Sequence, residues 1–121
     1  MMFKRCDECG AGVLVLKDCK CNCGITCCDK PMRELKANTT DGAVEKHKPM
    51  YNIVGENMEV YVNHVMEDDH YIEWIRVVWN NEEYTKYFKP GDEPKIIVPY
   101  KSGAKLYSYC NKHLFWVSTV E

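Results

Sequence analysis

The sequence predicts a mainly β protein, in which a small cysteine-rich front module precedes an antiparallel β-sandwich of immunoglobulin-like type. Residues 58–64 alternate with a period of two, which is the pattern of a half-buried strand. Residues 71–79 are β-branched and aromatic, as strands prefer. Turn residues recur at short intervals from residue 54 onward, so the body of the chain should consist of short strands.

Turn signals at 54–57, 80–81, 89–92 and 101–103 divide this body into seven expected strands. They are residues 51–54, 58–64, 71–79, 83–88, 95–99, 105–110 and 114–119. Seven short strands at this spacing are typical of an immunoglobulin-like sandwich. About one helical turn is expected near residues 42–47, since residues 39–41 offer N-cap oxygens and Pro49 disfavours helix at Lys48.

Composition narrows the class of protein. A chain of 121 residues is one ordinary domain, or one small domain plus a fragment. The net charge of −2 argues against nucleic-acid binding, and no apolar run is long enough to span a bilayer. The N-terminus, Met-Met-Phe-Lys-Arg-Cys, has no apolar signal core, so we expect a cytoplasmic protein.

The cysteines are unevenly distributed. Seven of the eight lie between residues 6 and 28, which favours metal ligation over disulfides in a cytoplasmic protein. We therefore expect a domain boundary, with a metal-binding domain at residues 1–36 and a histidine-bearing β domain at 37–121. Fewer than forty residues cannot bury a sufficient core, so bound metal should hold the front domain together.

Four of these cysteines form a recognisable ligand pattern. Cys6 and Cys9 are separated by two residues, as in a metal knuckle, and Gly10 permits the positive φ that such turns need. Cys27 and Cys28 are vicinal, a spacing that rarely forms a disulfide because the geometry is strained. Four thiolates make a tetrahedral sulfur site that suits iron or zinc.

A second group combines one thiol with all four histidines. Cys110 and His113 flank an expected turn, where backbone N–H groups can point at the sulfur. His64 and His70 lie at the two ends of one loop. Taken alone, each pair is also consistent with a buried cysteine or with solvated histidines, and Glu45-Lys46-His47 alone is best interpreted as a charged helical turn. In combination they predict one redox metal site made of His47, His64, His70, Cys110 and His113.

Two other classes of protein compete with this interpretation. A blue-copper electron-transfer protein also places Cys-x2-His on a β-sandwich, but it usually needs only two histidines and a methionine after the last ligand. A zinc-stabilised interaction module fits poorly, because zinc prefers four ligands. Metal analysis separates the three classes.

These residues carry a family resemblance. The motifs are Cys6-x2-Cys9, Cys27-Cys28-x2-Pro31-Met32, Glu45-Lys46-His47-x-Pro49, His64-x-Met66-x3-His70-Tyr71-Ile72-Glu73-Trp74, Lys89-Pro90-Gly91-Asp92 and Cys110-Asn111-x-His113. In this order they resemble the desulfoferrodoxin, or superoxide reductase, family in its two-iron form with a desulforedoxin-like front domain. The resemblance covers nearly the whole chain.

The resemblance implies two mononuclear iron sites. Cys6, Cys9, Cys27 and Cys28 would hold the front iron. His47, His64, His70 and His113 would be equatorial ligands of the second iron, with Cys110 as its axial thiolate. The implied reaction is the one-electron reduction of superoxide to hydrogen peroxide at an open sixth position, with Glu45 able to occupy that position in the oxidised state and Lys46 assisting the anion. A small iron or copper electron-transfer protein without catalytic activity is the alternative.

The resemblance also implies partners, namely superoxide as substrate, a rubredoxin-like electron donor and a second copy in a homodimer, without nucleic acid or membrane. The chain departs from the family at residues 18–26, which carry three additional cysteines, Cys19, Cys21 and Cys23. One of them could replace Cys27 or Cys28 as a ligand, or they could be spare thiols that oxidise or take up extra metal.

Overall fold

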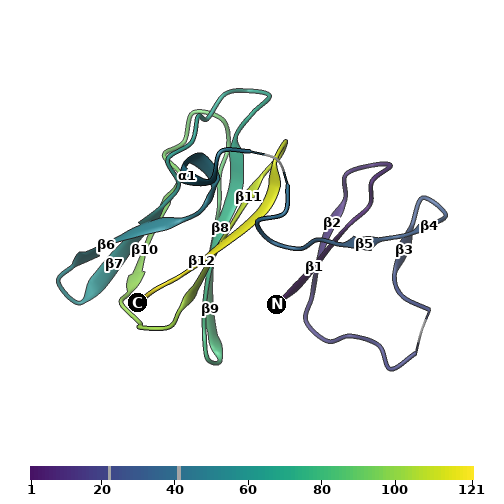
Figure 1. The fold of residues 1–121 in the computed structure, drawn as a ribbon, viewed down its shortest axis with the longest axis horizontal. Helices are drawn as coiled ribbons and strands as arrows, with labels where there is room; N and C mark the ends of the chain where they lie inside the picture. The colour runs from purple at the N-terminus through teal and green to yellow at the C-terminus, as the bar shows by residue number, and fades with distance from the viewer. Residues whose placement is uncertain (22, 41) are drawn as a thin grey trace. The chain divides into compact units, whose positions relative to one another are not determined.

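The computed structural model describes residues 1–21, 23–40 and 42–121, together with the backbone but not the side chain of Glu45. The chain forms two compact units, Met1–Lys36 and Ala37–Glu121. Their elements are labelled in Figure 1.

The front unit contains two small antiparallel sheets. β1 (Met2–Arg5) lies between β2 (Gly12–Val15) and β5 (Arg33–Glu34). β3 (Thr26–Cys27) pairs with β4 (Lys30–Pro31) in a hairpin. Few side chains of this unit are buried, the main ones being Phe3, Cys6, Met32 and Leu35. So small a core agrees with the expectation that the unit depends on another source of stability.

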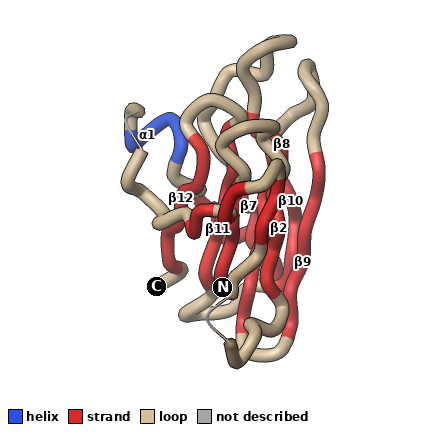
Figure 2. The backbone as a smooth tube through the Cα atoms, turned by 90° about the vertical axis from the view of Figure 1, so that its right-hand side faces the viewer, coloured by secondary structure: helices blue, strands red, loops and turns tan. Residues whose placement is uncertain are grey.

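The second unit is a sandwich of seven antiparallel strands, which confirms the predicted fold class. One sheet has the order β10-β7-β6 and the other the order β12-β11-β8-β9. The strands are β6 (Met50–Val54), β7 (Asn57–Tyr61), β8 (Ile72–Trp79), β9 (Glu82–Tyr87), β10 (Lys95–Pro99), β11 (Lys105–Cys110) and β12 (Leu114–Thr119). Figure 2 shows that nearly all regular structure is strand, in red, with the short helix α1 (Val44–His47) in blue.

The core of the sandwich lies between the two sheets. On β7 the buried side chains Met58 and Val60 alternate with the more exposed Glu59 and Tyr61, as the period of two predicts. Apolar side chains of the facing strands complete one cluster, which includes Ile75, Val98 and Leu106. Full burial of each such side chain contributes about 1.5–3 kcal/mol to stability.

Two local features place Cys110 and His47 near one end of β11. The pairing of β11 with β8 shifts register between Tyr109 and Cys110, so that Cys110 pairs with Ile72. The helix α1 (Val44–His47) contacts β11. The hydroxyl of buried Ser108 on β11 donates to the carbonyl of His47 over 2.6 Å, which fixes the last residue of the helix.

Beyond strand ends that differ by one residue, two details differ from the sequence prediction. The strand expected over 58–64 ends at Tyr61, because the chain turns at residues 62–64, where the His64 N–H bonds the carbonyl of Val62. The helix begins after Ala43, without a side-chain cap hydrogen bond, so the expected N-cap at 39–41 is wrong for Thr39 and Thr40, while Asp41 lies outside the described residues. No helix within the described part of the chain is long and apolar enough to cross a membrane.

Candidate metal centres

The structure brings the four histidines and Cys110 together. One donor atom from each of these five residues lies within 4.8 Å of those from all the others. His47 ends α1, His64 and His70 lie in the loop between β7 and β8, and Cys110 and His113 flank the turn between β11 and β12. His47 and Cys110 are buried, while the other three are partly exposed.

Hydrogen bonds fix which ring nitrogen faces the cluster. Nδ1 of His47 contacts the carbonyl of Ala43 at 2.7 Å, and Nδ1 of His64 contacts the carbonyl of Val65. Their Nε2 atoms are therefore the ones that point inward, toward Nδ1 of His113 at 2.9 Å and toward Sγ of Cys110 at 3.5 Å respectively. Sγ of Cys110 lies 3.8 Å from Nδ1 of His113. The carbonyl partners hold the rings in the orientation that a metal ligand requires.

Contacts with neighbouring side chains hold the ligand residues in place. The His47 ring stacks on Trp116, with centroids 4.9 Å apart, and the indole N–H of Trp116 donates to the carbonyl of His113 over 2.9 Å. Asn111 joins the two loops that carry ligands, since its side chain bonds the N–H of Tyr71 and the carbonyl of Asp69, each over 2.9 Å. The loop of His64 and His70 is thereby tied to the turn of Cys110 and His113.

The surroundings of His64 and His70 favour their neutral imidazole forms. Burial lowers the pKa of His64 and of His70, and the positive charge that other histidines of the cluster would carry lowers both further. Neutral imidazole is the form that binds metal. Burial raises the pKa of the Cys110 thiol, opposed by hydrogen bonds from the backbone N–H groups of His113 and Lys112. These are the N–H groups that the sequence predicted would point at the sulfur.

Of the two residues predicted to act beside the metal, Lys46 is described in full and Glu45 by its backbone alone. Lys46 is exposed in the last turn of α1, one residue before the buried His47. The side chain of Glu45 lies outside the described residues. The other cation near the turn, Lys112, forms an ion pair with Asp69 over 3.7 Å.

The four front cysteines also converge, with one donor atom from each within 4.8 Å of the others. Sγ of Cys27 lies 3.7 Å from Sγ of Cys9 and 4.0 Å from Sγ of Cys28. Two turns make this possible. Gly10 has φ +80°, as expected, and Cys28 and Asp29 have φ +53° and +62° in the hairpin between β3 and β4. Two successive positive φ values are typical of a tight hairpin turn that matches strand twist.

The thiols of this front group influence each other's ionisation. Backbone N–H groups of Cys9 and Glu8 bond the sulfur of Cys6, which lowers the pKa of Cys6 to about 7 against the opposing effect of burial. The neighbouring sulfurs of Cys9, Cys6 and Cys28 raise the pKa of Cys27 to about 12. With its pKa raised this far, Cys27 stays protonated at neutral pH when no metal is bound. A bound cation would stabilise its thiolate form.

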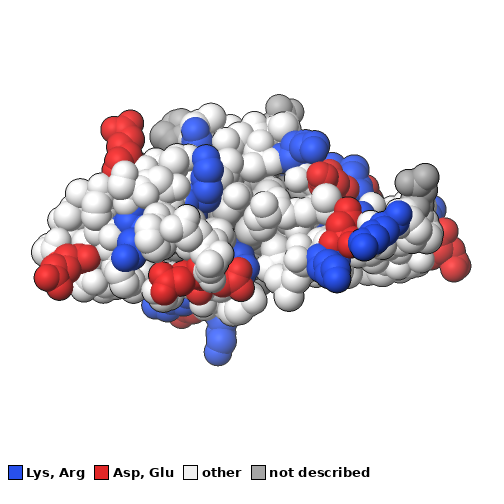
Figure 3. Space-filling model, turned by 90° about the horizontal axis from the view of Figure 1, so that it is seen from below, with Lys and Arg blue, Asp and Glu red and all other residues white. Residues whose placement is uncertain are grey.

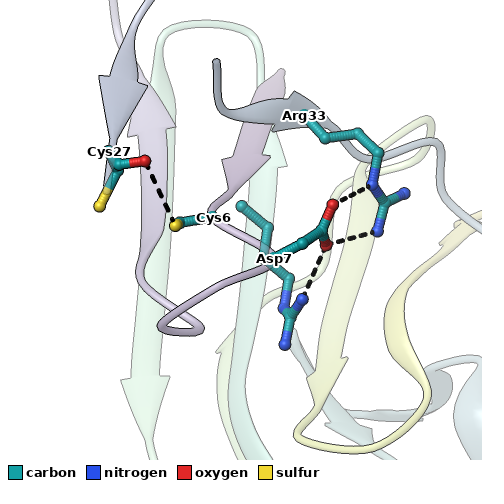
Figure 4. Close-up of polar contacts among 5 residues, drawn as sticks. Cys6, Asp7, Cys27 and Arg33 are labelled. Atoms are coloured by element: carbon teal, nitrogen blue, oxygen red, sulfur yellow. Dashed lines mark hydrogen bonds and ion pairs between the residues drawn. The ribbon is translucent and has the colours of Figure 1, made fainter. Parts of the chain in front are cut away.

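Ion pairs brace the knuckle between Cys6 and Cys9. The carboxylate of Asp7 accepts two hydrogen bonds from Arg33, at 3.0 and 3.1 Å, and one from Arg5 at 2.9 Å. Figure 4 shows Asp7 facing Arg33, and beside it the contact of Cys6 Sγ with the carbonyl of Cys27 at 3.7 Å. The Arg33 hydrogen bonds lower the pKa of Asp7. Asp7 and Arg33 are exposed and Arg5 is partly exposed, so we expect orientation rather than much stability from these ion pairs.

The three additional cysteines take no part in the front group within the described residues. Cys21 and Cys23 form a disulfide, and Cys19 is a free, exposed thiol. The structure thus places Cys27 and Cys28, rather than one of these three, beside Cys6 and Cys9.

Both donor sets fit a metal. A tetrahedral sulfur site with metal–sulfur bonds of about 2.3 Å has sulfur–sulfur edges of about 3.8 Å, close to the distances found among Cys9, Cys27 and Cys28. Bonds of about 2.1 Å to adjacent nitrogens give an edge of about 3.0 Å, close to the separation of His47 and His113. Nε2 of His70 is buried and has no hydrogen-bond partner among the described residues, which is the state expected of a metal donor.

Sequence reasoning missed one residue that shapes this centre. A Cβ at Gly42 would lie 3.1 Å from Cε1 of His47 and 3.3 Å from Cγ of His113. Glycine therefore lets the backbone lie directly against two of the rings. A glycine just before a short helix carries no signal of this contact, which depends on a residue far along the chain.

Fold and donor sets together define the class: a β-sandwich protein with one four-histidine, one-cysteine group and one four-cysteine group, each suited to a metal. A family model for desulfoferrodoxin matches residues 39–119. The desulfoferrodoxin of Syntrophotalea carbinolica is 38% identical over 94% of this chain and 92% of its own, and a desulfoferrodoxin homologue of Archaeoglobus fulgidus is 37% identical over 98% and 96%. The chain belongs to the desulfoferrodoxin family.

Solved structures agree with this fold. The superoxide reductase of Treponema pallidum matches with a TM-score of 0.69 and 22% identity, over 91% of this chain and 93% of that one. A one-iron superoxide reductase of Giardia intestinalis matches with a TM-score of 0.55 and 24% identity, over 64% and 98%. At these identities the likeness concerns the fold.

Proposed function

We propose that this chain is a superoxide reductase, which converts superoxide to hydrogen peroxide with one electron and two protons. The observation that supports this most directly is the convergence of four imidazoles and one buried thiol on one point. Two solved structures of similar fold are named superoxide reductases, and this chain matches the family model for desulfoferrodoxin.

The proposed cofactor is iron at both groups. Iron held by His47, His64, His70, His113 and Cys110 would supply the single electron that superoxide takes up. Five donors exceed the four that zinc prefers. A metal that accepts six ligands would keep one position open for a further ligand. Copper electron-transfer sites use fewer histidines and a weak methionine ligand, and Met66 instead accepts the N–H of Ile72 over 3.4 Å.

The protein residues in this proposal position and charge the site. Cys110 lies at 0% exposure, so its sulfur is shielded from solvent while the partly exposed rings of His64, His70 and His113 form the accessible side. A small anion and the protons it needs can approach from that side. Acidic and basic side chains are interspersed on the face shown in Figure 3, in keeping with a net charge of −2, so attraction of an anion should be local.

Lys46 is the residue proposed to supply this local attraction. It is exposed, adjacent to His47, and has no ion-pair partner among the described salt bridges, unlike Lys112, which pairs with Asp69. Glu45 is proposed to approach the same centre in the oxidised state, as the family resemblance implies. A rubredoxin-like donor and a homodimer complete the proposal and stay predictions.

The front group is proposed to serve electron transfer only. Four thiolates fill a tetrahedral site and leave no position for substrate. We therefore expect Cys9→Ser to disturb the front iron while the reaction with superoxide continues at the second iron. Loss of that reaction in a variant that still holds the second iron would contradict this role.

The decisive experiment mixes the reduced, iron-loaded protein with a calibrated pulse of superoxide and follows peroxide and oxygen together. Reduction yields one peroxide per superoxide and no oxygen, whereas dismutation yields oxygen without a reductant. Oxygen evolution would refute the proposal. Metal analysis of the protein as isolated provides the control, since copper or zinc alone would exclude an iron reductase.

A further inference from the structure

Three cysteines between β2 and β3 have no role in either metal group. Cys19, Cys21 and Cys23 occupy alternate positions, and all three are exposed. Cys21 and Cys23 are joined by a disulfide, and Cys19 is free. We call these residues the thiol triplet.

The disulfide contributes little to holding the fold together. It joins residues that are already two apart, within one connection, and it links no two strands. In the chain-entropy description the stabilisation grows with the length of the closed loop, so a loop this short gains the least. A bond with so small a structural role, and with both partners exposed, is one that redox chemistry can open and close.

We propose that the thiol triplet is a thiol–disulfide exchange site whose partner is a dithiol protein. The inference does not depend on the proposed reaction with superoxide.

Cys19 is placed to take part in the exchange. Its thiol contacts the carbonyl of Cys21 over 3.2 Å, and its own N–H bonds the carboxylate of Asp18 over 2.9 Å. One residue separates Cys19 from Cys21, just as one residue separates Cys21 from Cys23. Attack by Cys19 on the sulfur of Cys21 would therefore form an equivalent disulfide and release Cys23 as a thiolate, with no net oxidation.

The surroundings favour a protein partner with an anionic attacking thiolate. Lys17 and Lys20 are exposed and flank Cys19, against the single carboxylate of Asp18. Leu16, directly before them, is 84% exposed, the highest value for a large apolar side chain among the described residues. Leu16 lies three residues before Cys19 in the sequence, so a protein partner has an exposed apolar side chain to contact that a small thiol could not use.

The external step balances without a further reagent. One thiolate of the partner attacks Sγ of Cys23, the bond to Cys21 breaks, and Cys21 leaves as a thiolate. The second thiol of the partner then attacks the mixed disulfide and frees Cys23. Two electrons and two protons pass to Cys21 and Cys23, and the partner leaves as a disulfide.

The test equilibrates the full-length, iron-loaded protein with mixtures of reduced and oxidised glutathione over about a thousandfold range of ratios. The folded protein is then alkylated, so that thiols holding metal are protected, and labelled cysteines are identified by tandem mass spectrometry. We expect Cys21 and Cys23 to gain label together within this range. A disulfide that never forms, or that persists over the whole range, would overturn the proposal.

Matched variants assign the step to these residues. Cys21→Ser with Cys23→Ser should abolish the two-thiol step, whereas Cys19→Ser should keep it. Cys23→Ser should form a disulfide between Cys19 and Cys21. Both iron absorption spectra should be unchanged in all variants, which excludes misfolding. A step that survives in the double variant would place the thiols in the front metal group and refute the assignment.

Thioredoxin with its reductase and NADPH is the probe for the partner class. At equal thiol concentration we expect it to reduce the disulfide about tenfold faster than glutathione, because its second thiol resolves the mixed disulfide within one complex. Equal rates would refute the proposal that the partner is a dithiol protein.

Discussion

Replacing Gly42 by alanine should disturb the histidine–cysteine centre through a single added methyl group. The new Cβ would lie 3.1 Å from Cε1 and 3.2 Å from Nδ1 of His47, and 3.3 Å from Cγ of His113. All three distances are shorter than ordinary van der Waals contact. Two imidazoles must therefore move by a few tenths of an ångström.

The His47 ring has little room to yield. It is 3% exposed, stacks on Trp116, and is held by the carbonyl of Ala43 at Nδ1. Overpacking of this kind costs about 1–3 kcal/mol. The reduced freedom of the unfolded chain returns about 0.4–1 kcal/mol, so the net loss should be about 1–2 kcal/mol. A difference of about 1.4 kcal/mol changes an equilibrium constant tenfold. If the destabilisation acts on the metal-bound state, iron binding should weaken by about tenfold.

The assay combines chelator competition for the histidine-bound iron with urea unfolding of the metal-free protein. Gly55→Ala is the matched control, because nothing lies within 4 Å of its added Cβ, while its φ of +63° still penalises alanine. That control should lose stability and keep its iron affinity. If Gly42→Ala instead binds iron as tightly as wild type and unfolds at a higher urea concentration, the methyl group has found space and the reasoning is refuted.

Three further predictions concern charge, support and pH. Lys46→Ala should slow the reaction with superoxide by up to about tenfold and reduce its dependence on salt in stopped-flow measurements; an unchanged rate would remove its steering role. Ser108→Ala should leave the carbonyl of His47 without its buried donor and cost about 1–3 kcal/mol in urea unfolding, so a loss below about 0.5 kcal/mol would count against this support. Burial raises the pKa of Tyr107 above its unfolded value of 10, so its favourable contribution is complete below pH 10 and declines as pH rises. The stability of wild type relative to Tyr107→Phe should therefore fall as pH rises above 10, and a constant difference would contradict the shift.

The strands of the sandwich were predictable because their information is local. Alternation on β7 and the β-branched run on β8 identify both strands from sequence alone. The end of β7 was not predictable in this way. The alternation continues in the sequence to His64, whereas the chain turns at Val62 and takes that histidine out of the strand, into the loop that forms the site.

The metal groups were predictable only in part. Ligand types and spacing suggested which side chains would meet, and the structure brings those side chains together. The supports behind them were not visible. The contact of Gly42 with His113 and the bond from Ser108 to His47 join residues far apart in sequence, which no local pattern encodes. The short helix illustrates this, since it begins without a side-chain cap and its last residue, His47, is held by Ser108 of β11.

The spacing of the ligands has a consequence for the order in which the two centres can form during synthesis. The front contacts span 21 residues, from Cys6 to Cys27, and all of these residues are made before His47. His47 and His113 are 66 residues apart, and the second of them is made long after the front cysteines. The histidine centre can form only after β11 and β12 have been synthesised and have closed the sandwich. The growing chain should therefore be able to acquire its front metal before the ligands of its second metal have all been made.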